Sequence, residues 1–207
     1  MRIAPPAAAL AALLAATAAP AQVPDRAVGL GVSLNPATLV MEEGETTLML
    51  PVGFGNIYLP IIGGPHLKIE PEFGIWHTSS STSASTYSSS YSSTLLRVGV
   101  GVFSLARVGG GTALYIGPRA AIVRSSSESS SSGGTEPTKW HQTNYVIGLA
   151  AGGEHFFSPH LSLGAEVQFN YVKVGQAEHE PDYGTAYATT RTSMISNNGL
   201  LFIRLYR

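Results

Sequence analysis

Hydrophobic and polar side chains alternate with a period of two along most of the chain from residue 26 onward. In the clearest segment, residues 161–171, apolar and polar positions take turns: Leu161, Leu163, Ala165, Val167, Phe169 and Tyr171 against Ser162, Gly164, Glu166, Gln168 and Asn170. Successive side chains of a β-strand point to opposite faces, whereas an α-helix would scatter both sets around its circumference. The segment is therefore predicted to be a β-strand with one apolar and one polar face.

The same alternation predicts eight strands in total. They are expected at residues 26–40, 46–62, 66–78, 94–108, 112–124, 142–157, 161–174 and 189–206. The second strand is the least regular, because Pro51 and Pro60 cannot donate a ladder hydrogen bond and the alternation slips near Gly55. This indicates a bulge or an edge within that strand.

Short and long connections alternate between the predicted strands. The tight turns are Gly63-Gly64-Pro65, Gly109-Gly110-Gly111 and Ser158-Pro159-His160, and the long polar loops are expected near 79–93, 125–139 and 175–188. Short turns at one end and long loops at the other are typical of outer-membrane barrels. The predicted fold is therefore all-β, an eight-stranded antiparallel up-and-down transmembrane β-barrel.

The first 21 residues differ from the rest. A positive start at Arg2 precedes an Ala/Leu run over 7–16, which is too short to span a bilayer, and Ala19-Pro20-Ala21 gives the small-x-small pattern of a cleavage site. We expect a signal peptide over 1–21, cleaved after Ala21, and an exported barrel domain over 22–207.

Composition narrows the class of protein further. The chain is 44% hydrophobic and only 12% charged, and its net charge is −1; charged residues make up about 25% of a typical soluble domain. The absence of cysteine excludes disulfides, Cys-ligated zinc and a thiol nucleophile. Without a basic stripe, a nucleic-acid partner is not expected, and no sequence motif calls for a cofactor.

Charged residues on the polar face of the predicted strands are balanced in sign. They are Lys68, Glu70, Glu72, Arg97, Arg119, Glu154, Glu166 and Arg204. An eight-stranded barrel is too narrow for an aqueous channel, and buried charges must pair and form hydrogen bonds. We therefore expect a closed polar lumen filled by this network, which has a structural role.

Residues 26–207 resemble the small eight-stranded outer-membrane β-barrels of the OmpA/OmpX type. The resemblance implies a bacterial outer-membrane location and insertion by the barrel-assembly machinery, whose signal in the last strand is matched by Asn197, Gly199 and Phe202. Arg204 stands at the next aromatic place of that signal, and the chain ends in Arg207 instead of an aromatic residue.

A soluble, exported barrel of the lipocalin type is the alternative interpretation, with an apolar ligand inside and polar side chains outside. Small residues on the polar face, among them Gly99, Gly101 and Gly117, favour the membrane barrel. They leave room for long charged side chains in a crowded lumen, and they have no evident use on a solvated outer surface.

Two cations lie on the apolar face near the predicted outer ends of the strands. Arg124 and Lys173, with Tyr145 and Tyr171 beside them, would sit at head-group level, where a charge costs little. Aromatic residues are enriched at the same level. The residues form a predicted lipopolysaccharide rim, and solvation of the two cations by water is the equally weighted alternative.

Candidate chemistry elsewhere is sparse. His77 and Ser79 are similar to the His-x-Ser pair of outer-membrane lipid A deacylases, but no acidic residue follows before Glu128, so no enzymatic activity is expected. The run 178–182 holds one histidine and three carboxylates, which is more typical of a solvated loop than of a metal site. The predicted role is structural or at the surface, in adhesion or shielding, with outer-membrane lipid and lipopolysaccharide as partners and no extracellular partner indicated.

Overall fold

The computed structural model describes residues 22–42, 45–49, 54–84, 87–132, 137–180 and 193–207. Within these ranges no helix is long and apolar enough to cross a membrane. The strands are β1 (Arg26–Glu42), β2 (Glu45–Met49), β3 (Phe54–Tyr58), β4 (Ile61–Gly63), β5 (Leu67–Ala84), β6 (Tyr87–Gly109), β7 (Thr112–Ser131), β8 (Thr138–Ser158), β9 (Leu161–Lys173), β10 (Ala177–Glu180) and β11 (Ser193–Tyr206). The expected signal peptide, residues 1–21, lies outside the described residues and stays a prediction.

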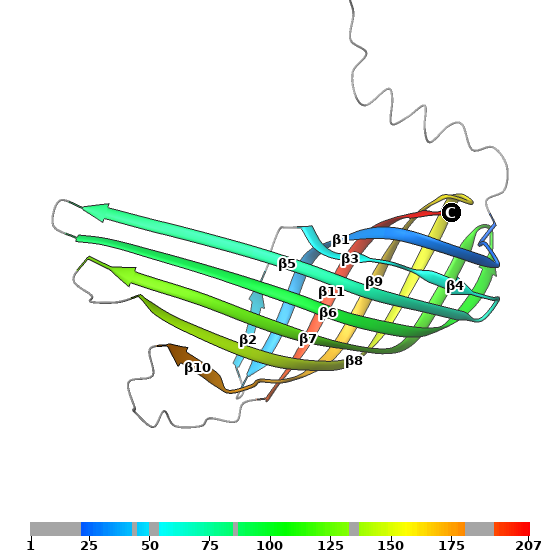
Figure 1. Ribbon diagram of the computed structural model, residues 1–207. Helices are drawn as coiled ribbons and strands as arrows, with labels where there is room; N and C mark the ends of the chain where they lie inside the picture. Colours follow the sequence, from blue (N-terminus) through cyan, green and yellow to red (C-terminus); the bar gives the residue numbers. More distant parts are fainter. Residues whose placement is uncertain (1–21, 43–44, 50–53, 85–86, 133–136, 181–192) are drawn as a thin grey trace, which may run out of the picture.

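The strands close into a ring (Figure 1). Hydrogen-bonded neighbours follow the order β8-β7-β6-β5-β3-β1-β11-β9, and β9 pairs back to β8. The second position of the ring is shared by β2, β3 and β4, which all pair with β1, so the ring has eight positions. Every pairing is antiparallel. The predicted all-β, eight-stranded class is confirmed.

The irregular second strand is interrupted near the expected places. β3 ends at Tyr58 and β4 begins at Ile61, and the intervening Pro60 carbonyl accepts a 2.8 Å hydrogen bond from the Gly29 N–H. The register between β1 and β3 shifts between Val32 and Leu34, which marks a bulge or irregularity. Because β3 and β4 pair with both β1 and β5, these segments are not an edge.

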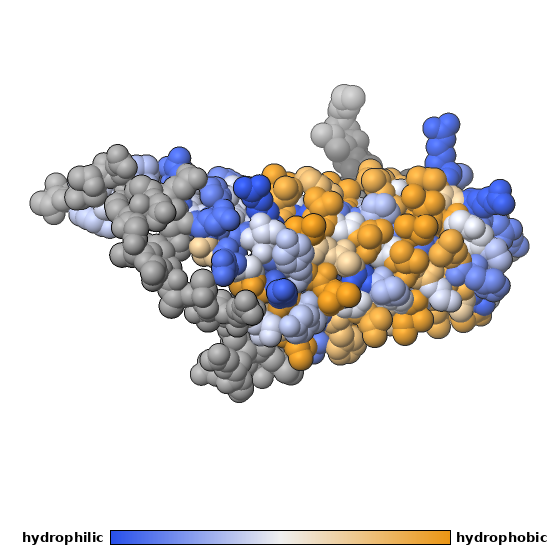
Figure 2. Space-filling model, turned by 60° about the horizontal axis from the view of Figure 1, so that its bottom comes forward, coloured by the Kyte–Doolittle hydropathy of each residue, from blue (hydrophilic) through white to orange (hydrophobic). Residues whose placement is uncertain are grey.

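Large apolar side chains point away from the ring. Ile75 and Ile147 are 62% and 61% exposed, and similarly placed residues include Val98, Ile116, Phe169 and Leu205. Figure 2 shows hydrophobic residues covering the side of the barrel, with hydrophilic residues gathering towards its ends. A lipocalin-type barrel would face these side chains inward, so that alternative is wrong.

The serine-rich stretches expected as loops are largely strands. Ser79–Ala84 of β5 pairs with Tyr87–Ser92 of β6, and Glu128 of β7 pairs with Lys139 of β8. In the third expected loop, β10 pairs with the start of β8, while residues 181–188 lie outside the described ranges. Serine and threonine occupy both faces here, so no apolar alternation reveals the strand, although the backbone ladder continues from the barrel.

This continuation makes the wall of the barrel unequal in height. We call residues 78–84, 87–94, 125–131 and 138–142 the extension. In Figure 1, β5, β6, β7 and β8 reach beyond the ends of β9 and β11. β9 stops at Lys173, whose partner on β8 is Tyr145, so β8 residues 138–142 rise above it.

Aromatic side chains fill the interior at the short-turn end. Phe103, Tyr115, Phe156, Phe202 and Tyr206 are buried there, and the rings of Phe103 and Tyr115 meet edge-on with centroids 5.0 Å apart. Val23 packs against this cluster, and Asp25 forms an ion pair with Arg107 beside the β6–β7 turn. The segment before β1 is therefore tied to the end of the barrel.

Candidate functional site

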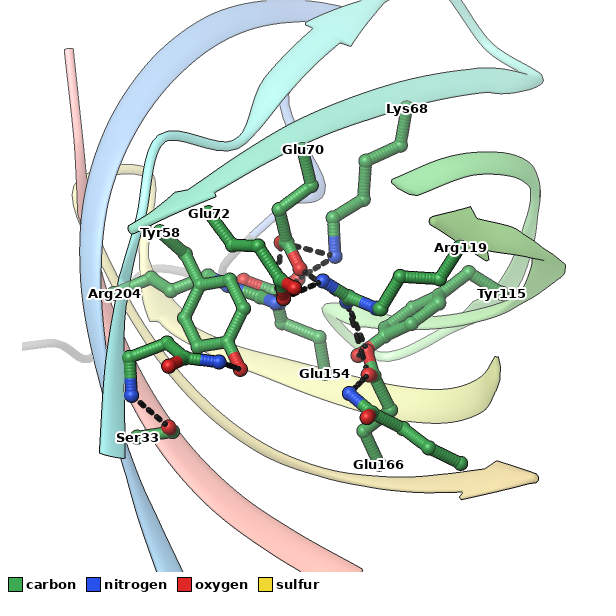
Figure 3. A network of polar contacts seen from close by, with 12 residues as sticks. Ser33, Tyr58, Lys68, Glu70, Glu72, Tyr115, Arg119, Glu154, Glu166 and Arg204 are labelled. Atoms are coloured by element: carbon green, nitrogen blue, oxygen red, sulfur yellow. Dashed lines mark hydrogen bonds and ion pairs between the residues drawn. The ribbon is translucent and has the colours of Figure 1, made fainter. Parts of the chain in front are cut away.

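The eight charged residues expected in the lumen lie together in the middle of the barrel, and Figure 3 labels all of them except Arg97. β5 contributes Lys68, Glu70 and Glu72 at alternate positions, so all three side chains point to the same face. The other members come one from each of β6, β7, β8, β9 and β11: Arg97, Arg119, Glu154, Glu166 and Arg204. The shared parity of six strands thus brings distant residues to one place.

Arg119 is the hub of one half of this network. Its Nη1 lies 2.6 Å from Glu72 Oε2, and its Nη2 lies 2.9 Å from both Glu70 Oε1 and Glu166 Oε1. Arg97 Nε donates to the second oxygen of Glu72 at 2.7 Å. A guanidinium presents five donors in a planar fork, which suits one cation among three carboxylates.

Lys68 and Arg204 complete the network on the other side of Glu70. Lys68 Nζ lies 3.1 Å from Glu70 Oε2 and 3.6 Å from Glu154 Oε2. Arg204 pairs with Glu70 and places Nη1 2.7 Å from Glu154 Oε2. Arg204 Cζ lies 3.6 Å from the centre of the Phe202 ring, and Lys68 Nζ lies 3.7 Å from the centre of the Tyr115 ring. Both cations therefore contact the carboxylates on one side and the buried aromatic cluster on the other.

Neutral side chains donate further hydrogen bonds to two of the carboxylates, Glu154 and Glu166. Tyr115 donates to Glu166 at 2.8 Å, Tyr206 to Glu154 at 2.7 Å, and Gln168 to Glu166 at 2.6 Å. Ser162 Oγ donates to Glu154 at 2.5 Å. Sequence reasoning did not include these four partners in the site, although their strand parity already placed them on the same face as the charges.

Burial and charge balance decide what this site can do. The side chains of Lys68, Glu70, Glu72, Arg119, Glu154, Glu166 and Arg204 are at most 1% exposed, and Arg97 is 12% exposed. Each carboxylate has at least one cation within ion-pair distance. The network therefore neutralises the buried charges within the barrel.

Glycines on the interior face make room for the long side chains. A Cβ added at Gly31 would lie 2.6 Å from Arg204 Cγ, one at Gly99 would lie 2.6 Å from Glu72 Oε1, and one at Gly152 would lie 2.5 Å from the Tyr115 hydroxyl. Non-bonded atoms do not approach one another so closely, so a larger residue at any of these positions would displace the network.

The outward apolar surface, the closed ring and the charged interior together describe a barrel made for a bilayer. A family model for the outer membrane protein beta-barrel domain matches residues 7–192. The chain belongs to this family. It is a protein of the bacterial outer membrane.

Solved structures of small eight-stranded outer-membrane barrels share the fold, which confirms the expected resemblance. Neisserial surface protein A matches with a TM-score of 0.52 and 14% identity, over 88% of this chain and 97% of that one. The attachment invasion locus protein Ail of Yersinia pestis, in complex with the heparin analogue sucrose octasulfate, matches with a TM-score of 0.50 and 14% identity, also over 88% and 97%. A search of curated protein sequences finds no match.

The four residues of the expected rim lie together on the outer face of this outer-membrane barrel. Tyr145 pairs directly with Lys173, and Tyr171 lies across from Ile147 on the same face. Arg124 pairs with Thr143, two residues from Tyr145 along β8. Arg124 and Tyr145 line a surface hollow of about 380 Å³ together with Glu178 and polar residues of β8.

The remaining chemical candidates are separated. His77 Nδ1 lies 2.8 Å from Thr94 Oγ1 on the exposed outer face, and Ser79 is exposed two residues further along β5. Of the run 178–182, the backbone of residues 178–180 belongs to β10, while Pro181 and Asp182 lie outside the described residues. Within the described part of the chain no three His, Asp or Glu side chains are grouped to hold a metal ion.

Proposed function

We propose that this outer-membrane barrel is a non-enzymatic surface protein, with a lumen closed to ions and a role in adhesion or shielding. The observation that carries the proposal is that ion pairs and aromatic rings fill the middle and the short-turn end of the interior, while the hydroxyl-rich extension rises beyond the rim. A barrel that conducts ions needs open space in its lumen, and a surface role does not.

The closed lumen is supported by the network and by the layer next to it. Eight balanced charges in ion-pair contact occupy the middle, and the aromatic cluster around Phe103 and Phe202 occupies the short-turn end. Ion flow would have to break several of these buried pairs at once, and breaking one such pair costs about 3–5 kcal/mol.

The surface role is supported by the extension, which continues four strands beyond the barrel rim. Ail, which shares the fold, is an attachment protein that binds a sulfated heparin analogue. We infer a related, contact-making role for this chain. Insertion through the barrel-assembly machinery belongs to the same proposal, and it is supported by Asn197, Gly199 and Phe202 in the last strand.

Deleting residues 81–92 is expected to leave insertion intact and to reduce attachment of expressing cells to host-cell monolayers. Thr78 and Ser93 are paired across β5 and β6, so the deletion leaves Ser79 and Ser80 as a two-residue hairpin turn. The removed stretch buries no part of the barrel core, so the folded band should keep its heat-modifiable migration on a denaturing gel.

Attachment is compared at equal surface amounts of the deletion variant and the parent protein. Undiminished attachment would contradict the role of the extension. Loss of the folded band would contradict its independence from the barrel.

We further propose that the outer rim binds lipopolysaccharide through Arg124 and Lys173, with Tyr145 and Tyr171 beside them. The proposal is supported by their common place on the outer face at the base of the extension. Phosphates are the anions that lipid A offers at this level, and arginine can hold one with two parallel hydrogen bonds.

The Arg124→Ala/Lys173→Ala double variant is expected to retain several-fold less lipopolysaccharide than the parent barrel after purification, because it lacks both cations. Co-purified and rebound lipopolysaccharide are measured by phosphate and fatty-acid analysis. The matched control is Lys139→Ala, which removes an exposed cation of the extension above the rim. Equal retention by the double variant and the parent would leave both rim residues as solvated charges.

A further inference from the structure

The two faces of the extension differ in character. The face that continues the barrel interior is neutral among its described side chains above Arg97: Tyr91, Ser93, Ser125, Ser127, Ser129, Trp140 and Gln142. The charged side chains Glu128 and Lys139 lie on the opposite face, where Glu128 Oε2 and Lys139 Nζ are 4.0 Å apart. Arg124 lies on that opposite face too, at the base of the extension. We call the neutral face the inner face of the extension.

Two aromatic rings converge on this inner face. Tyr91 on β6 and Trp140 on β8 are separated by β7, yet their ring centroids are only 6.0 Å apart with a tilt of 37°. Ser127 lies on the strand between them and is 5% exposed, and its hydroxyl donates to Ser93 Oγ at 2.9 Å. Hydrogen bonds with Ser127 and Ser93 also lower the pKa of Tyr91 below its ordinary value.

Neither the barrel core nor the lipid girdle accounts for this pair. The extension lies above the rim, and Tyr91 remains 41% exposed, so the rings do not close a hydrophobic core. Girdle aromatics such as Tyr145 face outward towards lipid, whereas Tyr91 and Trp140 face inward by strand parity. The rings are therefore available to a ligand from the outside medium.

Tilted aromatic rings that have hydroxyl groups around them, and no ionic group among the described side chains beside them, suit one class of ligand. The C–H faces of a pyranose ring stack on aromatic faces, and its hydroxyls exchange hydrogen bonds with serine, tyrosine and amide groups. A sulfated or phosphorylated ligand would need cations, and among the described side chains of this face the nearest cation is Arg97, which already binds Glu72.

We propose that the inner face of the extension binds a neutral oligosaccharide, with one pyranose ring held at Tyr91 and Trp140. The inference deepens the proposed surface role and rests on it. It also separates this chain from Ail, whose solved complex holds a sulfated ligand.

The test titrates the full-length barrel with cellotetraose and maltotetraose, two neutral glucose tetramers, in micelles of a detergent without a sugar head group. The chain has two tryptophans, so a Trp76→Phe background leaves Trp140 as the fluorescent reporter. Saturable change of its emission with at least one tetramer is expected, together with at least tenfold weaker binding by Tyr91→Ala. Sulfated cellotetraose is expected to bind more weakly than the neutral form.

The matched control is Phe73→Ala, which removes an aromatic ring of similar exposure from the outer face, 42% against 41% for Tyr91, and should bind like the parent. No saturation with either tetramer, or equal binding by the sulfated form, would overturn the proposal. Unchanged affinity in a folded Tyr91→Ala variant would also overturn it. If Tyr91→Ala loses its folded band, Tyr91→Phe keeps the ring, and tetramer binding by that variant within threefold of the parent is then required.

The sugar site and the surface role can fail separately. If the 81–92 deletion abolishes attachment while neither tetramer binds, the surface role stands and the sugar site is wrong. If a tetramer binds through Tyr91 while the deletion leaves attachment unchanged, the site stands and the role in attachment is wrong.

Discussion

Replacing Arg119 by methionine is expected to lower the free energy of unfolding by about 3–5 kcal/mol, because it leaves Glu70, Glu72 and Glu166 without their shared cation. Methionine keeps much of the side-chain volume, so the loss reports charge more than packing. The measurement is the urea midpoint for unfolding from lipid vesicles, followed by heat-modifiable migration.

Two companion variants make the result specific. Arg124→Met removes an exposed cation from the same strand and should change stability by less than about 0.5 kcal/mol. Adding Glu166→Gln to Arg119→Met removes one of the carboxylates that lost its cation, and it should recover part of the lost free energy of unfolding. An unchanged midpoint for Arg119→Met would contradict a dry, paired lumen, and steady conductance of the parent in planar bilayers would contradict its closure.

Gly117→Val is expected to abolish the folded band. A Cβ at Gly117 would lie 2.0 Å from the Val102 carbonyl oxygen and 2.9 Å from the Phe103 Cα, both of which belong to the backbone of β6. No side-chain rotation relieves such a contact, so β6 and β7 would have to separate where Pro118 already donates no ladder hydrogen bond. Overpacking of ordinary cores costs about 1–3 kcal/mol, and a backbone clash exceeds that range.

Ala120→Val is the matched control for Gly117→Val. Ala120 is three residues along the same strand and exposed on the outer face, where valine fits both the strand and the lipid. It should refold like the parent. A folded Gly117→Val barrel with the parent's urea midpoint would contradict the close approach of β6 and β7.

Much of the interior was predictable because a strand has only two faces. Once Glu166 was assigned to the polar face of its strand, Gln168 and Asn170 followed it inward, and all three are buried. The sign balance of the eight charges then predicted pairing. Which carboxylate each cation contacts depends on the stagger between strands, and that stagger is set by turns and bulges distributed around the whole ring.

The extension was not predictable by the same means. Ser79, Ser90 and Ser130 belong to strands in water, where neither face needs apolar residues, so no alternation marks them. These residues are in strands because the hydrogen-bonded pairing of β5, β6 and β7 continues in the same register from the barrel into the extension. The Tyr91–Trp140 contact likewise depends on three strands lying side by side, whereas each residue alone is an isolated aromatic in a serine-rich stretch.

The ring is closed by its two ends, since β1 pairs with β11 and the N–H of Val28 donates to the carbonyl of Arg207 at 3.2 Å. This contact joins residues almost a whole chain apart, whereas β5 to β9 pair successively as local hairpins. Formation of β5–β9 therefore needs little loop closure, but the last seam needs the complete chain. Until that seam forms, β1 and β11 are long unpaired edges open to pairing with other chains. The slow and aggregation-prone step of assembly thus lies at the seam, furthest from the serine-rich wall.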